Sequence, residues 1–436
     1  MSQARYLMLE NNFPTLYALN RDGTYQVWNV WADGSETVVE FGKENGKMQY
    51  KRTKCFAKNI GKKNETTDTE QAVLEAKSKW EKQVRLGYRV SKDDLTKTQD
   101  FSPMLAHDAI KRKSSLVYPL HVQPKLDGVR ALVLVGDDGV PVFNSRGNKT
   151  YPVQGQLLDQ MSKLAKKTGL KMFDGELYIH GLSLQKIVSL AKKWRTPEEI
   201  ECEIEKDYQS DIKRFEKAIN NGDEFWKDSE GLEHPITKKP EKNINKYCGY
   251  SSLDLEYHIF DIPSEDDTPW MSSDTDKCRF NNLQKVSEYT WPYNLIKVVH
   301  GAIVSDEDRV KMLIKEFMEA GYEGVVIRNF HGKYEFGQRS SDLQKWKLFQ
   351  DGEARVLDSF EDKNGEGVLL CAEKDGTQFN CKMRGTHEER SQENMKKLIG
   401  KYITFTYQAR TDDGVPQFPV GKCVREVDSL TWDPIY

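Results

Sequence analysis

The spacing of hydrophobic positions changes along the chain, and these changes predict four regions. The first ends near residue 93 and begins with three segments of strand-like composition, TYQVWNVW, ETVVEFG and MQYKRTKCFAKN. Turn dipeptides bound these segments, which is typical of β-hairpins: Asp22-Gly23, Asp33-Gly34 and Asn45-Gly46. A series of apolar residues then predicts a helix that begins near Thr69. We therefore expect a small β-rich domain with one helix over residues 1–93.

The polar segment SKDDLTKTQD predicts a linker to a larger region, residues 101–349, where strand patterns such as VRALVLV and EYHIFDI alternate with helical ones. The segment DRVKMLIKEFMEAG has apolar residues at helical spacing and a terminating glycine: Val310, Leu313, Ile314, Phe317 and Gly321. Residues 195–250 are strongly polar and partly helical, which indicates an insertion. Short β segments with Gly-rich turns after Asp351 predict an all-β domain over residues 350–436.

Composition excludes several classes of protein. Of the 436 residues, 37% are hydrophobic and 31% are charged, which suits a globular protein with a large wetted surface. No run of about 18 or more apolar residues occurs, so we expect no membrane span and no membrane partner. The N-terminal segment lacks a basic stretch followed by an apolar one, which argues against a secretory signal. Seven cysteines without a Cys-x-x-Cys pair argue against a disulfide framework or a structural zinc site. We expect a soluble intracellular protein, cytoplasmic or nuclear.

The net charge of −3 hides an uneven distribution. Residues 1–93 carry 16 basic and 12 acidic side chains, a net of +4, which leaves −7 for the rest of the chain. Between positions 47 and 63 there are seven basic residues and no acidic one, interleaved with aromatic residues. Such a stretch favours contact with nucleic acid phosphates, and we assign this role to Lys51, Arg52 and Lys54. Residues 197–233 carry 13 acidic and 5 basic side chains.

The segment Gln123-Pro124-Lys125-Leu126-Asp127-Gly128-Val129-Arg130 directly precedes a predicted strand. A lysine beside a carboxylate and a glycine can act as a nucleophile if its amine is neutral, which requires a lowered pKa. On its own, a Lys-x-Asp-Gly tetrapeptide usually marks a turn, so its meaning depends on context.

Five further motifs follow in order: SRGNK (145–149), FDGELY (173–178), EYHIFDIP (256–263), YEGVVIR (322–328) and LQKWKLF (343–349). Together with PKLDGVR, this series resembles the covalent nucleotidyltransferase superfamily, and specifically the ATP-dependent DNA ligases. The resemblance runs from about Phe101 to at least Arg425. It implies an α+β multidomain protein: an ATP-grasp-like adenylyltransferase core of antiparallel sheets and helices, a C-terminal OB-fold β-barrel, and the small N-terminal domain.

The resemblance also implies roles for individual residues. Lys125, with Asp127 beside it, resembles the nucleophile that attacks the α-phosphate of ATP. The positions that correspond to the nucleotide site of the family are Gln123, Pro124, Leu126, Arg130, Arg146, Glu176, Phe260, Glu323, Lys345 and Lys347. Among them, Arg130 and Glu176 match contacts to the nucleotide sugar, and Arg146 matches an arginine that meets the nucleotide or the 5′-phosphate of the nick. Phe260 matches the aromatic residue that stacks on adenine, and its alternative is an ordinary core position.

Glu176 and Glu323 match carboxylates that position Mg²⁺ or Mn²⁺, and Mg²⁺ needs few protein ligands when substrate phosphates supply the rest. Lys345 and Lys347 are two residues apart, so on a strand they would share one face. We expect both to contact the α-phosphate and to lower the pKa of Lys125 by like charge.

The implied reaction transfers AMP from Lys125 to a 5′-phosphate at a nick in duplex DNA, after which a 3′-hydroxyl displaces AMP. Because nothing resembles an NAD-specific module, we expect ATP as the adenylate donor. We expect a monomer that acts in replication, repair or recombination, encoded either by a cell or by a virus. The nearest alternative is an RNA ligase or a GTP-dependent capping guanylyltransferase. A second alternative is a catalytically silent DNA-binding scaffold.

The C-terminal region resembles the OB domain of these ligases, and OB-folds bind nucleic acid. We assign contacts with DNA to Lys382, Arg384 and Arg425, and also to Arg328 and Arg146. For Lys382 and Arg384, plain surface charge is the alternative. The last family motif is altered here, with Gln417-Phe418-Pro419 and then Arg425-Glu426-Val427-Asp428, where Asp428 replaces a lysine. This change leaves the roles of Lys422 and Arg425 open.

The N-terminal domain resembles WGR domains, which bind DNA in poly(ADP-ribose) polymerases. Trp31-Ala32-Asp33 stands where the Trp-Gly-Arg signature would be. The alternative is a solvated basic face that packs on the catalytic domain.

Overall fold

The computed structural model describes residues 13–426 except 21, 62–63, 96–100, 230, 265, 267, 273–277, 363–364 and 412. Asp428, Lys62, Lys63 and half of the predicted linker therefore lie outside the described residues. The chain divides into two compact units, residues 103–346 and the two flanking segments taken together. None of the helices in the described part of the chain has the length and hydrophobicity needed to span a bilayer.

The N-terminal segment forms an antiparallel sheet of four strands, in the order β1 (Leu16–Leu19), β2 (Tyr25–Asp33), β3 (Glu36–Lys43) and β4 (Gln49–Lys54), with the helix α2 (Asp68–Arg85). The three predicted strands and the helix are confirmed, whereas β1 was not expected. Helix α2 begins where Thr67 caps it: the Thr67 side chain accepts from the Glu70 amide at 3.2 Å, and the Glu70 carboxylate accepts from the Thr67 amide at 2.9 Å. Leu16, Trp28 and Ala76 form the core between sheet and helix.

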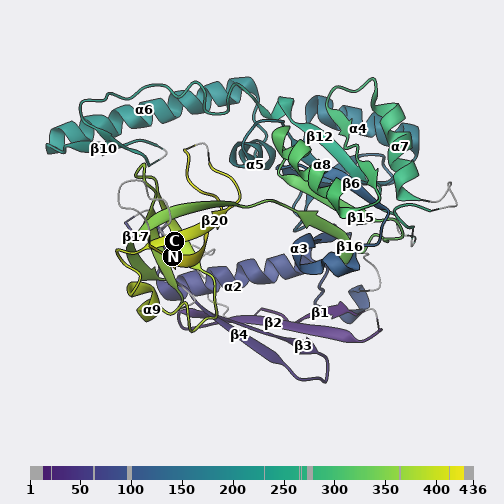
Figure 1. The fold of residues 1–436 in the computed structure, drawn as a ribbon, viewed down its shortest axis with the longest axis horizontal. Coiled ribbons are helices and arrows are strands. Elements are labelled where there is room, and N and C mark those ends of the chain that lie inside the picture. The colour runs from purple at the N-terminus through teal and green to yellow at the C-terminus, as the bar shows by residue number, and fades with distance from the viewer. Residues whose placement is uncertain are drawn as a thin grey trace. The chain divides into compact units, whose positions relative to one another are not determined.

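The unit 103–346 contains two sheets of five strands (Figure 1). The first has the order β13 (Ile296–Val298), β12 (Glu256–Asp261), β9 (Met172–Tyr178), β7 (Val129–Val135) and β8 (Pro141–Ser145). The second has the order β14 (Ala302–Val304), β6 (Leu120–Lys125), β15 (Gly324–Asn329), β16 (Arg339–Trp346) and β5 (Leu105–Asp108). As predicted, most strands of the two sheets pair in an antiparallel manner. The exceptions are β12 with β13 and β16 with β5, which pair in parallel.

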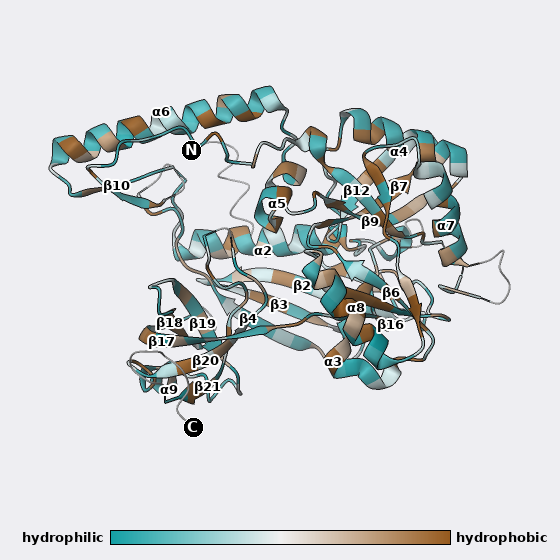
Figure 2. Ribbon diagram, turned by 45° about the horizontal axis from the view of Figure 1, so that its top comes forward, coloured by the Kyte–Doolittle hydropathy of each residue, from teal (hydrophilic) through white to brown (hydrophobic). Residues whose placement is uncertain are grey.

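Helices cover these sheets: α3 (Ala109–Arg112), α4 (Gly155–Thr168), α5 (Leu184–Lys192), α7 (Arg279–Thr290) and α8 (Glu307–Glu319). The predicted helix after residue 307 is confirmed, and Gly321 follows it with a φ of 85°, which favours glycine. Val310, Leu313 and Ile314 of α8 pack against the second sheet, in a core separate from that of the first sheet. Figure 2 shows the apolar residues concentrated on the strands of this unit.

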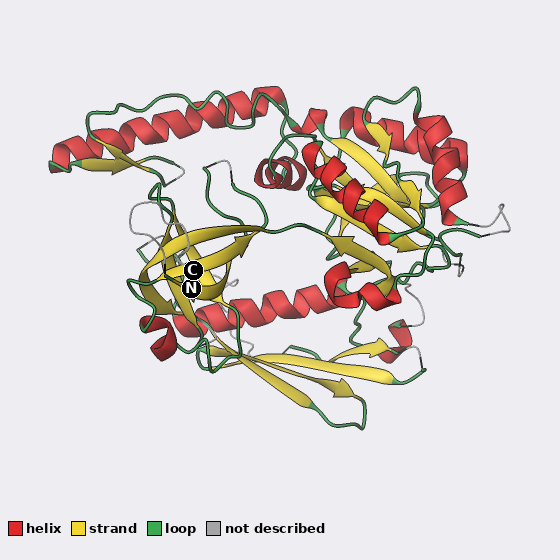
Figure 3. Cartoon of the chain, in the orientation of Figure 1, coloured by secondary structure: helices red, strands yellow, loops and turns green. Residues whose placement is uncertain are grey.

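The polar segment 195–250 contains one long helix, α6 (Pro197–Asn221), and a short hairpin of β10 (Phe225–Lys227) and β11 (Glu233–Pro235). Figure 3 shows α6 as an uninterrupted helix. The segment that follows the hairpin is held to α6 by ion pairs, since Lys246 lies 2.9 Å from Glu203 and 2.6 Å from Asp207. The acidic charge of this helix is therefore partly neutralised by its own return segment.

After residue 349 the chain forms a closed barrel of five strands: β17 (Gln350–Glu361), β18 (Gly367–Ala372), β19 (Gln378–Met383), β20 (Tyr402–Tyr407) and β21 (Val420–Arg425), with the short helix α9 (Gln392–Lys396). The strand order is β17-β18-β19-β21-β20, and β20 pairs back with β17. The core of this barrel contains Leu369, Phe379, Ile403 and Phe405.

Candidate active site

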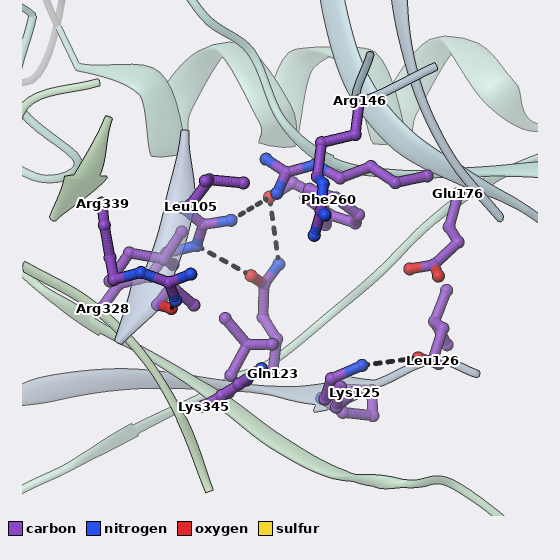
Figure 4. Close-up of a pocket in the computed structure, with 15 residues that line it drawn as sticks. Leu105, Gln123, Lys125, Leu126, Arg146, Glu176, Phe260, Arg328, Arg339 and Lys345 are labelled. Atoms are coloured by element: carbon purple, nitrogen blue, oxygen red, sulfur yellow. Dashed lines mark hydrogen bonds between the residues drawn. The ribbon is translucent and has the colours of Figure 1, made fainter. Parts of the chain in front are cut away.

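One face of the second sheet carries the residues of the first and last predicted motifs. Gln123 of β6 pairs with Val326 of β15, and Val326 pairs with Lys345 of β16, so the three side chains lie next to one another. Lys125 is two residues after Gln123 and shares its face. A cavity of about 240 Å³ lies over this face (Figure 4). Ten predicted residues line it: Gln123, Pro124, Lys125, Leu126, Arg130, Arg146, Glu176, Phe260, Arg328 and Lys345.

Lys125 is the last residue of β6, and its ammonium group forms an ion pair with the carboxylate of Glu323. The ammonium also donates to the Leu126 carbonyl at 3.2 Å, and the Glu323 amide donates to the Lys125 carbonyl at 2.9 Å. Burial opposes the charged form, but the carboxylates of Glu323 and Glu176 outweigh it and raise the pKa of Lys125 above its ordinary value. The prediction that neighbouring lysines lower this pKa is wrong for the protein without substrate, because carboxylates are the closer charges.

Glu176 lies on β9, and its carboxylate accepts a hydrogen bond from the Gly128 amide at 3.1 Å. Burial raises the pKa of Glu176 to about 7, against the opposing charges of Lys125 and Arg130. The glycine is required here because a Cβ at position 128 would lie 2.6 Å from the Leu177 carbonyl oxygen. The Asp-Gly of the lysine motif thus lets the loop pack against β9. Asp127 does not line the cavity, although its charge contributes to the raised pKa of Lys125.

Arg130 on β7 pairs with Asp174 on β9, with Nε and Nη2 at 3.0 and 2.5 Å from the two carboxylate oxygens. Asp174 is completely buried, and the Tyr334 hydroxyl donates to it at 2.6 Å. Sequence reasoning missed Asp174 and Tyr334. A signal for Asp174 was present, because Asp174 and Glu176 alternate on β9, and Arg130 pairs with Glu176 in the register of β7 and β9.

Phe260 lies in the wall of the cavity, with the guanidinium of Arg130 5.4 Å from its ring centre. Arg328 is 3% exposed; its guanidinium bonds Asp261 at 2.7 Å and the Gln123 side chain at 3.0 Å. Figure 4 shows Gln123 between Arg328 and Phe260. Because this guanidinium is buried against a carboxylate, the predicted contact of Arg328 with DNA is contradicted.

Lys347 does not line the cavity, in contrast to Lys345. Strand β16 ends at Trp346, and the Lys347 ammonium donates to the side chain of Gln408 at 2.9 Å. The alternation of side chains along β16, which predicted a common face for the two lysines, therefore does not extend to Lys347. Arg146, by contrast, is exposed and lines the cavity. Arg339, which was not predicted, is also exposed and lines it.

The predicted DNA contacts of the barrel are in different environments. Lys382 is held by Asp362 and Glu366, both at 2.6 Å, so its charge is neutralised within the barrel. The guanidinium of Arg425 donates to the Thr404 hydroxyl at 3.2 Å. The Lys422 ammonium lies 2.8 Å from Asp351. Arg384 is exposed, directly after β19.

The three predicted N-terminal contacts do not form one surface. In the register of β3 and β4, Lys51 pairs with Val39, which packs on the side of α2. Arg52 points to the opposite face, where it pairs with Asp33 at 2.8 Å and Glu36 at 3.0 Å. Lys54 shares the face of Arg52, with its ammonium 5.5 Å from the Phe56 ring centre. The strand register therefore places Lys51 on one face of β4 and Arg52 with Lys54 on the other.

Comparison with known families decides the assignment. Residues 103–347, more than half of the chain, match the family described as "ATP dependent DNA ligase domain", and residues 362–425 match "DNA ligase OB-like domain". The chain belongs to the ATP-dependent DNA ligases.

Individual relatives agree with this family. A DNA ligase of African swine fever virus (isolate Pig/Kenya/KEN-50/1950) is 26% identical over 348 residues, which are 77% of this chain and 68% of the viral protein. A DNA ligase of Haemophilus influenzae is 27% identical over 175 residues, 38% of this chain and 58% of its own length. Both matched domains lie beyond residue 102, so the N-terminal domain of the ligase is outside them.

Solved structures share the fold. The structure named "Pmar-Lig_PreS3" has a TM-score of 0.53 at 20% identity and covers 74% of this chain and 67% of its own. A Lig E DNA ligase described as binding DNA with a minimal scaffold has a TM-score of 0.50 at 20% identity, with 74% of this chain and 99% of its own covered. The enzyme is thus an ATP-dependent DNA ligase with a catalytic domain and an OB-like domain.

Proposed function

We propose that this ligase seals nicks between a 5′-phosphate and a 3′-hydroxyl in duplex DNA through an AMP group bound covalently to Lys125. The observation that carries the proposal is the position of Lys125, which lines the cavity together with Glu176 and whose ammonium is paired with Glu323. A nucleophilic lysine needs a confined site with charges that control its proton. Lys125 has the cavity as its site and the Glu323 carboxylate as the nearby charge.

In the first step, the neutral amine of Lys125 attacks the α-phosphorus of ATP. A phosphorus–nitrogen bond forms, the bond to the β-phosphate oxygen breaks, and pyrophosphate leaves. Because the ammonium is paired with Glu323, that carboxylate is placed to take the proton that the amine must lose before attack. Lys345 and Arg146 line the same cavity and supply positive charge for the phosphates.

In the second step, an oxygen of the DNA 5′-phosphate attacks the AMP phosphorus and Lys125 leaves as an amine. In the third step, the 3′-hydroxyl attacks the 5′-phosphorus of the DNA adenylate, a phosphodiester bond forms and AMP leaves. Phe260 offers a ring for adenine, and Arg130, held by Asp174, lies beside that ring. Each step is therefore carried out on one bound adenylate.

Glu176 and Glu323 are carboxylates on either side of the lysine motif, since Glu176 accepts from the Gly128 amide and Glu323 pairs with the Lys125 ammonium. The charge of Glu323 also helps to raise the pKa of Glu176, a repulsion that a divalent cation such as Mg²⁺ or Mn²⁺ would relieve. Within the described residues, no group of three or more His, Cys, Asp or Glu side chains is arranged to hold a metal ion. A cation at this place would therefore rely on these two residues together with substrate phosphates and water. Bound there, it would supply charge to neutralise the phosphates.

The test uses the full chain with α-labelled ATP or GTP and Mg²⁺, followed by nicked duplex DNA or nicked RNA. We expect a covalent AMP adduct with ATP, discharged onto nicked DNA, and no adduct with Lys125→Ala. An adduct formed only with GTP would indicate a capping enzyme, and discharge only onto RNA an RNA ligase. Absence of any adduct from the unmodified protein would exclude the proposed mechanism.

We further infer that the N-terminal domain binds DNA in the manner of a WGR-like module, with Lys51 among its contacts. The support is its net positive charge and the exposed edge strand β4, which carries Lys51.

We also infer that the ligase works as a monomer inside the cell, either a cell of its own organism or one infected by a virus, in replication, repair or recombination.

A further inference from the structure

Tyr334 connects the two sheets of the catalytic domain. Its hydroxyl donates to Asp174 of β9 at 2.6 Å and accepts from the backbone amide of Met104 at 3.2 Å. Asp174 belongs to the first sheet, whereas Met104 directly precedes β5 of the second. The tyrosine ring is fixed by Phe336, with ring centres 4.7 Å apart. Tyr334 is 230 residues from Met104 and 160 residues from Asp174 in the sequence, so its side chain makes two long-range links.

On the first sheet, Tyr334 donates a hydrogen bond to Asp174, the residue that pairs with Arg130. The Asp174 oxygen that accepts from Tyr334 also accepts from Arg130 Nη2 at 2.5 Å, while the other oxygen accepts from Arg130 Nε at 3.0 Å. Asp174 is completely buried, so these bonds are shielded from bulk solvent. The Tyr334 hydroxyl thus restricts the carboxylate that sets the position of the Arg130 guanidinium, which lines the cavity beside Phe260.

On the second sheet, Tyr334 anchors a wall of the same cavity. Leu105 and Ala106, which directly follow Met104, both line the cavity. The loop that carries Tyr334 holds this segment at two further points: the Glu335 amide donates to the Met104 sulfur at 3.3 Å, and the Leu105 amide donates to the Gln338 carbonyl at 2.7 Å. The Tyr334 hydroxyl is therefore one of three contacts that hold this wall of the cavity.

We propose that Tyr334 is a positioning residue for ATP: its hydroxyl holds Arg130 and the wall formed by Leu105 and Ala106 at the separation that the nucleotide requires. The inference rests on the proposed function, in which this cavity binds ATP and Lys125 accepts AMP. Tyr334 itself does not line the cavity, so it acts through Asp174, Arg130 and Met104.

The experiment measures single-turnover formation of the AMP adduct against ATP concentration for the full chain and Tyr334→Phe. The substitution keeps the ring against Phe336 and removes both hydrogen bonds. We expect the ATP concentration for half-maximal rate to rise about tenfold, as for loss of a hydrogen bond to a charged group, with the maximal rate within about twofold of wild type. The matched control is Tyr247→Phe, which removes a hydroxyl bonded to Glu203 at 3.1 Å outside the cavity. It should leave the ATP dependence unchanged.

A double-mutant cycle tests whether the effect passes through Arg130. In an Arg130→Lys background, Tyr334→Phe should raise the half-maximal ATP concentration by less than about threefold, because the geometry that it protects is already lost. The rise in melting temperature that ATP causes measures the affinity for ATP independently of the rate of adduct formation. This rise should be smaller for Tyr334→Phe than for wild type.

Three results would overturn the proposal: an unchanged ATP dependence in Tyr334→Phe, a full tenfold effect that persists with Arg130→Lys, or a fall in maximal rate alone. Failure of the proposed function would look different, since wild type itself would then form no adduct, or Lys125→Ala would still form one. The two claims are therefore separable in one set of measurements.

Discussion

The ammonium group of Lys125 is paired with the carboxylate of Glu323 at the point where β6 ends and β15 is about to begin. Because this pair raises the pKa of Lys125, the ligase without substrate holds its nucleophile in the charged, unreactive form. Before attack, the proton must therefore pass from the amine to Glu323, and we expect ATP binding to trigger this transfer. Until then, the pair stabilises the charge of a partly buried lysine.

The buried ion pair of Arg130 and Asp174 should matter far more to stability than an exposed one. Asp174→Asn leaves the partly buried guanidinium without its carboxylate, and we expect a loss of about 3 kcal/mol in the free energy of unfolding. The matched control is Asp137→Asn, where Asp137 pairs with Lys171 at 2.8 Å but is 97% exposed. For it we expect less than about 1 kcal/mol. Urea titration measures both, and equal losses would contradict the assigned burial.

His121 should make the ligase less stable in mild acid. Burial, with the charge of Arg328, lowers the pKa of His121 to about 3, so between pH 6.5 and 3 the unfolded chain binds a proton that the folded chain does not. Stability contributed by neutral His121 is complete above about pH 6.5 and falls by about 2 kcal/mol as the pH drops to about 5.

The variant His121→Phe keeps a ring against Trp270 and Phe280 but cannot titrate. Its unfolding free energy should decline less steeply between pH 7 and 5 than that of wild type, whatever its absolute stability. Parallel declines in the two proteins would show that His121 is already charged in the folded state.

Arg146 is exposed at the cavity and should contact a phosphate of the substrate. We expect Arg146→Ala to reduce the slope of log affinity for nicked DNA against log salt by about 0.9, the amount for one lost phosphate contact. Lys171→Ala serves as the control because Lys171 is exposed but paired with Asp137 away from the cavity. A slope that Arg146→Ala leaves unchanged would assign Arg146 to the nucleotide alone.

The N-terminal domain offers a sharper comparison within one strand. Lys51 and Arg52 are neighbours on opposite faces of β4, and only Arg52 is paired with two carboxylates in the described residues. If the domain binds DNA through Lys51, then Lys51→Ala lowers the salt slope by about 0.9, while Arg52→Ala changes it by much less. Salt-dependent binding of nicked DNA measures both. Identical slopes for all three proteins would remove the DNA-binding role from this strand.

The resemblance to the ligase family supplied most of the predicted site residues, and many of them lie on short strands whose alternation fixes their faces. Gln123 and Lys125 share a face for this reason, and so does Lys345 on the paired strand. The helix after residue 307 was predicted by its apolar spacing alone. Strand β1 was missed because four residues carry too little alternation to detect.

The errors came from contacts that no local pattern contains. Tyr334 and Met104 are 230 positions apart, and their hydrogen bond exists only once β5 has joined β16 in the second sheet. An arginine is usually expected at the surface. Arg328 is buried instead, because the carboxylate of Asp261 on a different strand neutralises the charge of its guanidinium. Lys347 was misplaced because the strand period was extended past Trp346, where β16 ends.

The central claim is that Lys125 carries the adenylate. The most direct measurement is peptide mass spectrometry of the full chain after incubation with ATP and Mg²⁺, with fragmentation that locates the added AMP. We predict one AMP group, on Lys125, which disappears when nicked duplex DNA is added. An AMP group on any other residue, or on Lys125 but retained in the presence of nicked DNA, would contradict the account.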